Sequence, residues 1–223
     1  MSRKRLLFLL SLLFFIVFLF FSFKVHEGSF KKIDFDTTVR VQNHISHRFD
    51  APFSLISLLG TAEITGVIWI GFFLFFLIKK NYLTAVSLFL FWSTVVAELY
   101  GKVFVYHPAP PFMFYRGVIN LQNFPSSYVH EDFSYPSGHT ARLTYLVMFL
   151  IVYFYLTKFR TYKLLLQIIL AFFLIAVYIS RIYLGEHWLS DVIGGALLGA
   201  SFGILSGLTI LAKQKQIKHS KDE

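Results

Sequence analysis

The sequence predicts an all-α polytopic membrane protein with six transmembrane helices, an interfacial helix and an outer-side loop. Its 223 residues are 56% hydrophobic, 19% aromatic and only 15% charged. So few charged side chains cannot cover a water-facing surface at the usual density. Six apolar runs also approach or exceed the length of about 20 residues that a helix needs to cross a bilayer. Both observations exclude a water-soluble enzyme.

The six apolar runs are expected to be the spans of one domain over residues 1–223. The first run follows a basic N-terminus, as a secretory signal would, but it is too long for a signal and no A-x-A cleavage site follows it. We therefore expect a retained anchor. No repeat or linker divides the chain. The expected spans are 6–23, 54–78, 83–101, 139–156, 163–182 and 189–212.

Positive charge predicts the orientation of these spans. Three Lys and Arg precede the first span, two follow the second, three follow the fourth and four follow the sixth, together 12 of the 21 in the chain. All 12 fall on one side if the spans alternate, and basic segments face the cytoplasm. Both termini are therefore expected to be cytoplasmic, in a bacterial inner membrane. The net charge of +9 is then a topology signal, and no nucleic-acid partner is expected.

The segment 24–53 is too polar to cross the membrane. Val41, Ile45 and Phe49 recur at i, i+4 and i+8, which predicts a helix lying on the membrane surface. The basic side chains of this segment are expected to face lipid headgroups; they are His44, His47 and Arg48.

Polar residues collect in three segments at span ends that share the outer side. Ionisable groups within or beside a membrane cost several kcal/mol unless they are paired, so they are functional candidates. The segments contribute Glu98, Lys102 and His107; then Ser137, His139 and Arg142; then Ser180, Arg181, His187 and Asp191.

The third segment has the most specific spacing. His187 and Asp191 are four residues apart, so on a helix they share a face and the carboxylate can accept a hydrogen bond from one imidazole nitrogen. The other nitrogen is then basic and directed outward, as in a nucleophile or general base. The alternative is a surface histidine paired with an aspartate four residues later.

The second segment predicts an anion site. Pro136-Ser137-Gly138 forms a tight bend directly before a span, and free N–H groups at a helix start attract anions. Lys102 and Arg181 are fixed cations that suit an anion with several oxygens. The alternatives are a plain turn, snorkelling to headgroups and, for Lys102, pairing with Glu98.

Together these residues resemble the type 2 phosphatidic acid phosphatase superfamily of membrane lipid phosphatases, including its lipid A phosphatase-like members. That signature has three blocks, K-x6-R-P, P-S-G-H and S-R-x5-H-x3-D. The second block is present at 136–139 and the third is complete from Ser180 to Asp191. The first departs from the pattern: six residues after Lys102 comes Ala109, where the family has arginine. Arg116 and Arg142 are the candidate replacements.

The resemblance implies a metal-independent hydrolase of phosphoric esters or anhydrides that needs no cofactor. His187, oriented by Asp191, would attack phosphorus and form a phosphohistidine. His139 would protonate the leaving alkoxide and then activate water. Phosphate would be held by Lys102, Ser137, Gly138, Ser180, Arg181 and Arg116.

The implied substrate is a membrane lipid with a phosphate monoester or diphosphate, reached from the outer, periplasmic face. Phosphatidic acid, phosphatidylglycerol phosphate, undecaprenyl diphosphate and the phosphates of lipid A all fit this description. The aromatic loop 106–133 is expected to set the choice; its aromatic residues include Tyr106, Phe112, Phe114, Tyr115, Phe124 and Tyr128. Nothing in the sequence indicates an oligomeric state.

Three alternative functions stay open. A phosphotransferase would pass phosphate to a second lipid instead of water. A non-catalytic lipid-binding relative is suggested by the missing arginine. A metal-dependent hydrolase would use four histidines, but no H-E-x-x-H motif or comparable close pair of ligands supports it; these are His107, His130, His139 and His187.

Overall fold

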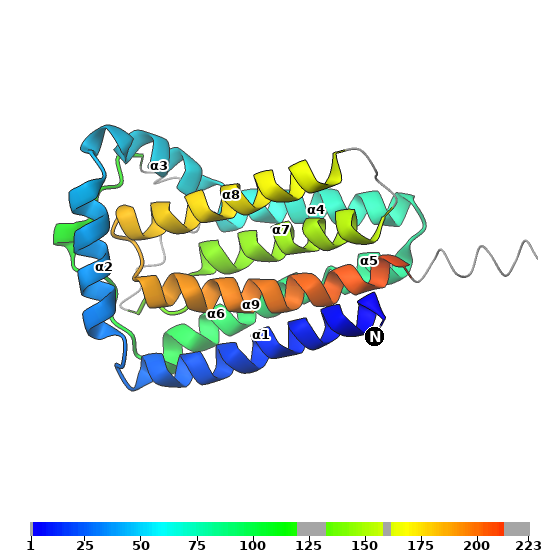
Figure 1. Ribbon diagram of the computed structural model, residues 1–223, viewed down its shortest axis with the longest axis horizontal. Helices are drawn as coiled ribbons and strands as arrows, with labels where there is room; N and C mark the ends of the chain where they lie inside the picture. The colour runs from blue at the N-terminus through cyan, green and yellow to red at the C-terminus, as the bar shows by residue number, and fades with distance from the viewer. Residues whose placement is uncertain (1, 120–132, 158–161, 212–223) are drawn as a thin grey trace, which may run out of the picture.

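The computed structural model describes residues 2–119, 133–157 and 162–211, which fold into a bundle of helices crossed at one end by a further helix (Figure 1). The chain begins, and the last described turn ends, at the opposite end of the bundle. We call the end that α2 crosses the α2 end, and the half of the bundle toward Arg3 and Leu211 the terminus half. The helices are α1 (Arg3–His26), α2 (Lys31–His44), α3 (Asp50–Leu58), α4 (Ala62–Ile78), α5 (Tyr82–Ser87), α6 (Leu90–Phe104), α7 (Gly138–Leu156), α8 (Lys163–Tyr183) and α9 (Leu189–Gly207).

The helices confirm the predicted all-α polytopic fold. Within the described ranges, five segments are long and apolar enough to cross a membrane, and α3 with α4 supplies a sixth if the bent pair is one span. This second expected span, 54–78, is not one straight helix, because the two parts meet at 42°. The Thr61 side chain accepts from the Ile64 N–H and caps α4, which ends α3 and restarts the helix.

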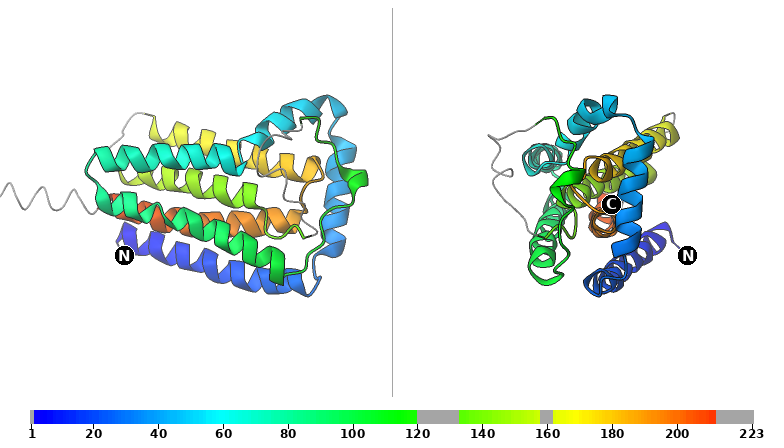
Figure 2. Two further views of the ribbon diagram at one scale, coloured as in Figure 1. Left: turned by 180° about the vertical axis from the view of Figure 1, so that it is seen from behind. Right: turned by 90° about the vertical axis from the view of Figure 1, so that its left-hand side faces the viewer.

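Helix α2 lies across the bundle end, as the two further views show (Figure 2). The expected apolar stripe through Val41, Ile45 and Phe49 is wrong, because α2 ends at His44 and Phe49 belongs to a separate short turn. Three polar side chains at four-residue spacing are buried instead, namely Asp34, Thr38 and Gln42. Two of them find hydrogen-bond partners at the bundle end. Gln42 donates to the carbonyls of Phe114 and Tyr183, and Asp34 accepts from Ser190, whereas the Thr38 hydroxyl has no partner among the described residues.

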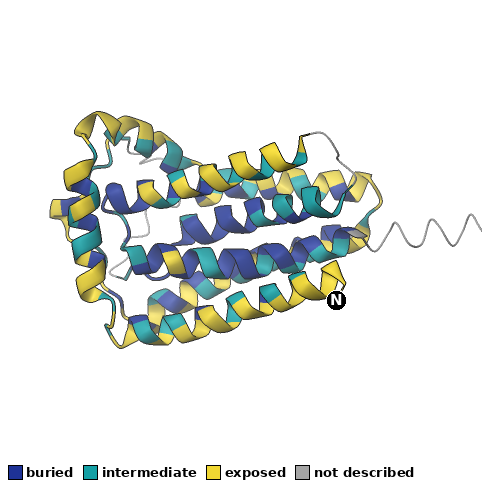
Figure 3. Cartoon of the chain, viewed as in Figure 1, coloured by how far each residue is buried: buried dark blue, intermediate teal, exposed yellow. Residues whose placement is uncertain are grey.

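Helices α7 and α9 form the buried centre of the bundle, whereas α1 and α8 expose much of their surface (Figure 3). Three glycines of α9 face α7 at four-residue intervals, at 195, 199 and 203. A Cβ on each would come closer than 3.0 Å to a carbonyl oxygen of Ser137, Ala141 or Tyr145. Only glycine therefore allows the two backbones to pack this closely.

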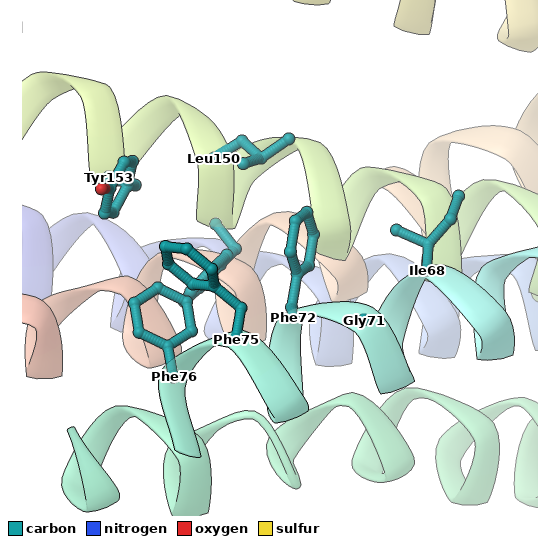
Figure 4. Close-up of a pocket in the computed structure, with 8 residues that line it drawn as sticks. Ile68, Gly71, Phe72, Phe75, Phe76, Leu150 and Tyr153 are labelled. Atoms are coloured by element: carbon teal, nitrogen blue, oxygen red, sulfur yellow. The ribbon is translucent and has the colours of Figure 1, made fainter. Parts of the chain in front are cut away.

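The terminus half is packed by aromatic rings. Trp69 stacks on Phe91 with ring centroids 6.2 Å apart, and Phe76 meets the edge of Phe149 at 5.7 Å. An apolar pocket of about 420 Å³ opens beside this cluster, between α4 and α7 (Figure 4). Its lining includes Phe72 and Tyr153, and no residue of the three polar segments lines it.

Part of the outer-side loop packs beneath α2. Phe114 is buried and meets Phe35 and Trp188 edge to face, while Phe112 is 86% exposed. Other residues singled out in the sequence lie outside the described residues; they are Phe124, Tyr128, His130, Lys158, Arg160 and the basic residues after 212.

Candidate active site

The second and third sequence blocks meet at the α2 end, where α7 and α9 begin. Ser137 is the N-cap of α7 and accepts from the Thr140 N–H at 3.4 Å. The Ser137 N–H donates to the Asp191 carbonyl at 3.0 Å. This bond ties the Pro-Ser-Gly turn to the first turn of α9, so two helix starts, each with free N–H groups, lie side by side.

His187 and Asp191 form the predicted pair. His187 Nδ1 lies 3.5 Å from Asp191 Oδ2, and both side chains are buried. At this distance Nδ1 makes no hydrogen bond within the described part of the chain. Oδ2 also accepts from the Trp188 N–H at 2.9 Å, which fixes the carboxylate on its own helix. A small shift of the imidazole would thus let the Nδ1–H donate a hydrogen bond to Asp191.

The protonation state of His187 suits a nucleophile. Burial lowers the pKa of His187, and Arg181 and Lys102 lower it further, against the raising effect of Asp191. A histidine with a lowered pKa is neutral at neutral pH, so one ring nitrogen carries a free lone pair.

His139 lies in the first turn of α7, against the break between α3 and α4. A Cβ on Gly60 would approach its Cβ to 3.0 Å. The ionisable groups near enough to influence it come from its own helix and from two other segments of the chain; they include Arg181, Arg142, His187 and Lys102. The structure therefore brings both histidines and three cations to one site.

Two carboxylates lie among these cations. Arg142 pairs with Glu98, and Lys102 Nζ lies 3.2 Å from Glu98 Oε1. The Glu98 carboxylate lies against Gly138, so a Cβ at this position would displace it from Lys102 and Arg142. Arg181 pairs in the same way with Glu186 and also donates to Ser57.

Two other predicted phosphate ligands have different neighbours. Ser180 Oγ donates to the Val177 carbonyl of its own helix at 2.7 Å. Arg116 donates to the Gln42 carbonyl at 3.2 Å, with its guanidinium 5.1 Å from the centre of the Tyr183 ring. Of the two candidates for the missing arginine, the structure therefore brings Arg142 beside the other cations and holds Arg116 beneath α2.

Sequence reasoning missed Asp34, and it named His107 as a polar candidate but gave it a role only in the metal-dependent alternative. His107 Nδ1 lies 2.9 Å from Asp191 Oδ1, and its Nε2 lies 3.6 Å from Asp34 Oδ2. Asp34 also accepts from the Ser190 N–H and hydroxyl, both at 2.8 Å. Among the described residues, no group of three or more His, Asp or Glu side chains is arranged to hold a metal ion.

Comparison with known proteins gives a family match and two structural likenesses. Residues 82–215 match the model of the PAP2 superfamily. Phosphatidylglycerophosphatase B of Bacillus subtilis (strain 168) is 40% identical over 74 residues, which cover 32% of this chain and 36% of that protein. The matched segment thus spans about a third of that relative's length.

Two crystal structures share the fold. One is a transmembrane PAP2 type phosphatidylglycerolphosphate phosphatase from Bacillus subtilis, with a TM-score of 0.69 and 23% identity, covering 93% of this chain and 96% of that one. The other is Aquifex aeolicus LpxE, with a TM-score of 0.57 and 24% identity, covering 78% and 94%. At these identities the likeness concerns the fold alone.

Proposed function

The chain belongs to the PAP2 superfamily, and from that premise we propose that it is a metal-independent phosphatase of membrane lipids that works through a phosphohistidine on His187. The observation that carries this proposal is the convergence of charged groups on the Pro-Ser-Gly turn. Glu98, which pairs with Lys102 and Arg142, lies against Gly138, and the Ser137 N–H donates to the carbonyl of Asp191, the partner of His187. Phosphoryl transfer requires positioning and charge neutralisation above all, and this site offers both.

In the first step, Nε2 of His187 attacks phosphorus while the bond to the lipid oxygen breaks. The ring becomes cationic, and its Nδ1–H donates to Asp191, which lies 3.5 Å away and stabilises the developing charge. His139 donates a proton to the departing alkoxide, which is otherwise a poor leaving group at neutral pH.

The phosphate oxygens are held by three cations and one helix start. Lys102, Arg142 and Arg181 supply positive charge, and the N–H groups at the start of α7 supply hydrogen bonds. Arg142 takes the part of the family arginine that is missing at Ala109. Phosphate binding then exchanges the carboxylates of Glu98 and Glu186 for phosphate oxygens, which present the same charge to the same cations.

In the second step, water replaces the lipid oxygen. His139 now lacks its proton, so it accepts one from the water as the oxygen attacks phosphorus. The bond from phosphorus to His187 breaks, and inorganic phosphate leaves. A lipid hydroxyl in place of water would turn the same step into a phosphotransfer, so identification of the product separates the two activities.

The proposed substrate is a lipid with a phosphate monoester or diphosphate in the outer leaflet of a bacterial inner membrane. The site lies at the α2 end and the chain begins at the other end (Figure 1), where the basic segments favour the cytoplasm. Phosphatidylglycerol phosphate is the first candidate, because the similar Bacillus subtilis sequence and the similar Bacillus subtilis structure are both named for it. Phosphatidic acid, undecaprenyl diphosphate and lipid A phosphates are the others.

The test is phosphate release from this panel of lipids by the purified chain in detergent with EDTA present. We expect release from at least one lipid and none from a His187→Asn variant that elutes and melts like the unaltered chain. Inhibition by EDTA would argue for a metal. Binding of the lipids without turnover would favour the non-catalytic relative.

A further inference from the structure

His107 lies between the buried carboxylates of Asp34 and Asp191. It is not one of the residues that the three sequence blocks specify. Its exposure is 5%, and the exposures of Asp34 and Asp191 are 2% and 0%. Two buried carboxylates this close to one imidazole are costly unless a cation lies between them. A doubly protonated histidine can donate to both, one ring nitrogen to each.

We propose that His107 is a positioning residue that fixes the Asp191 carboxylate for His187, and that Asp34 of α2 in turn holds His107. This inference rests on the proposed function, because it concerns how the nucleophile is oriented. It adds a chain of contacts from the helix across the bundle end to the phosphorylated histidine.

The orientation argument depends on the two oxygens of Asp191. Oδ2 accepts from the Trp188 N–H and faces His187. Oδ1 faces the other way and accepts from His107 Nδ1 at 2.9 Å. With both oxygens bonded, the carboxylate cannot rotate about its terminal torsion, so the oxygen facing His187 stays in place.

His107 is itself held by a rigid partner. Asp34 accepts two hydrogen bonds of 2.8 Å from Ser190, in the first turn of α9. These bonds attach α2 to the same helix start that bears Asp191. Both carboxylates therefore move with α9, and the imidazole bridges them.

The electrostatics agree with this geometry. Burial alone would lower the pKa of His107, but the hydrogen bond to Asp191 and the Asp34 carboxylate 3.6 Å away outweigh burial and raise the pKa to about 9. Among the described residues, Tyr135 also faces the ring, with ring centroids 6.4 Å apart. A histidine with this pKa stays charged throughout the neutral range.

The kinetic test compares His107→Asn and His107→Gln. An asparagine amide can replace Nδ1 as the donor to Asp191, whereas a glutamine amide reaches toward Asp34. We expect His107→Gln to lower kcat by about 10- to 100-fold with KM unchanged, since misplacement of a reacting group by about 1 Å has effects of this size. His107→Asn is expected to lose less.

The matched control is His26→Gln. It removes another imidazole that contacts the chain near His107, since His26 Nδ1 lies 3.1 Å from the carbonyl oxygen of Val105, two residues before His107. It should leave kcat within about twofold, as remote substitutions do. The proposal is overturned if folded His107→Gln retains kcat within that range, or if KM rises while kcat does not, which would make His107 a phosphate ligand.

A second measurement does not depend on turnover. In protein with isotope-labelled histidine, His107 should remain protonated at about pH 8, and in Asp34→Asn it should titrate at a lower pH because one carboxylate partner is lost. Titration of His107 near its ordinary value of 6.5 in the unaltered chain would contradict the bridge. An inactive chain with an intact bridge would instead mean that the proposed function has failed.

Discussion

In the terminus half of the bundle, the rings of Trp69, Phe76, Phe91 and Phe149 pack edge to face and face to face. At the α2 end, the buried side chains include Asp34, His107, Arg181 and Asp191. Packing apolar side chains inside a membrane protein costs little free energy, whereas burying charged side chains there is costly unless each one is paired. The difference fits the proposed function, in which the terminus half stabilises the fold and the charged groups of the α2 end take part in the chemistry.

The largest expected effect is that of Asp191→Asn at the α2 end. It removes the charge that stabilises the His187 cation, and kcat should fall by about 10³- to 10⁴-fold, as for the aspartate of other histidine-based sites. Phosphate release under saturating lipid measures it.

The matched control for Asp191→Asn is Asp50→Asn, at the same end of the bundle. Asp50 accepts from the Tyr183 hydroxyl and pairs with exposed His47, away from the cations of the site. We expect its kcat to stay within about twofold of the unaltered chain. Equal losses in both variants would mean that any buried charge at this end matters only for stability.

Phe149→Ala in the terminus half should lower the stability of the protein and leave kcat unchanged, the opposite of what is expected for Asp191→Asn. Removal of a ring that is 1% exposed and contacts Phe72 and Phe76 should lower the free energy of unfolding by about 3–5 kcal/mol. The folded fraction should keep its kcat. Thermal unfolding in detergent measures the first effect, with lipid-facing Phe172→Ala, 68% exposed, as the control that loses much less.

Arg142→Ala tests which arginine replaces the one missing at Ala109. We expect about a 10²-fold loss of kcat/KM, the effect of removing one donor that stabilises transition-state charge. Arg116→Ala should stay within about twofold, because Arg116 is held by Gln42 and Tyr183. The assignment is wrong if Arg116→Ala is the more damaging change, and partial rescue of Arg142→Ala by Ala109→Arg would strengthen it.

Gly199→Ala probes the boundary between the two regions. The added methyl meets the Ala141 carbonyl of α7, so the helices must separate slightly, at a cost of about 1–3 kcal/mol in stability. Because Asp191 lies two turns along the same helix, a small fall in kcat should accompany the lower melting temperature. Unchanged stability would show that α7 and α9 do not depend on close backbone contact.

The spans and two of the three blocks could be predicted from the sequence because each depends on local spacing. A bilayer sets the length of an apolar run, and a four-residue interval places His187 and Asp191 on one face. The predicted single span 54–78 overlooks the bend at 59–61, although its signal is local: Gly60 precedes Thr61, whose side chain caps α4.

The rest of the site depends on contacts between distant parts of the chain. Asp34 bonds to Ser190, 156 residues away, and nothing local distinguishes it from Asp36 in the same polar helix. The choice between Arg116 and Arg142 is likewise made by tertiary structure, because Glu98 of α6 draws Arg142 toward Lys102.

The most direct test of the account is to trap the phosphorylated enzyme. The chain is mixed with a lipid that carries labelled phosphate, quenched within the first turnover and digested for mass spectrometry. The account predicts label on His187 that is stable in base and labile in acid, and no label in His187→Asn. Phosphate release without a labelled histidine, or label on another residue, would contradict it.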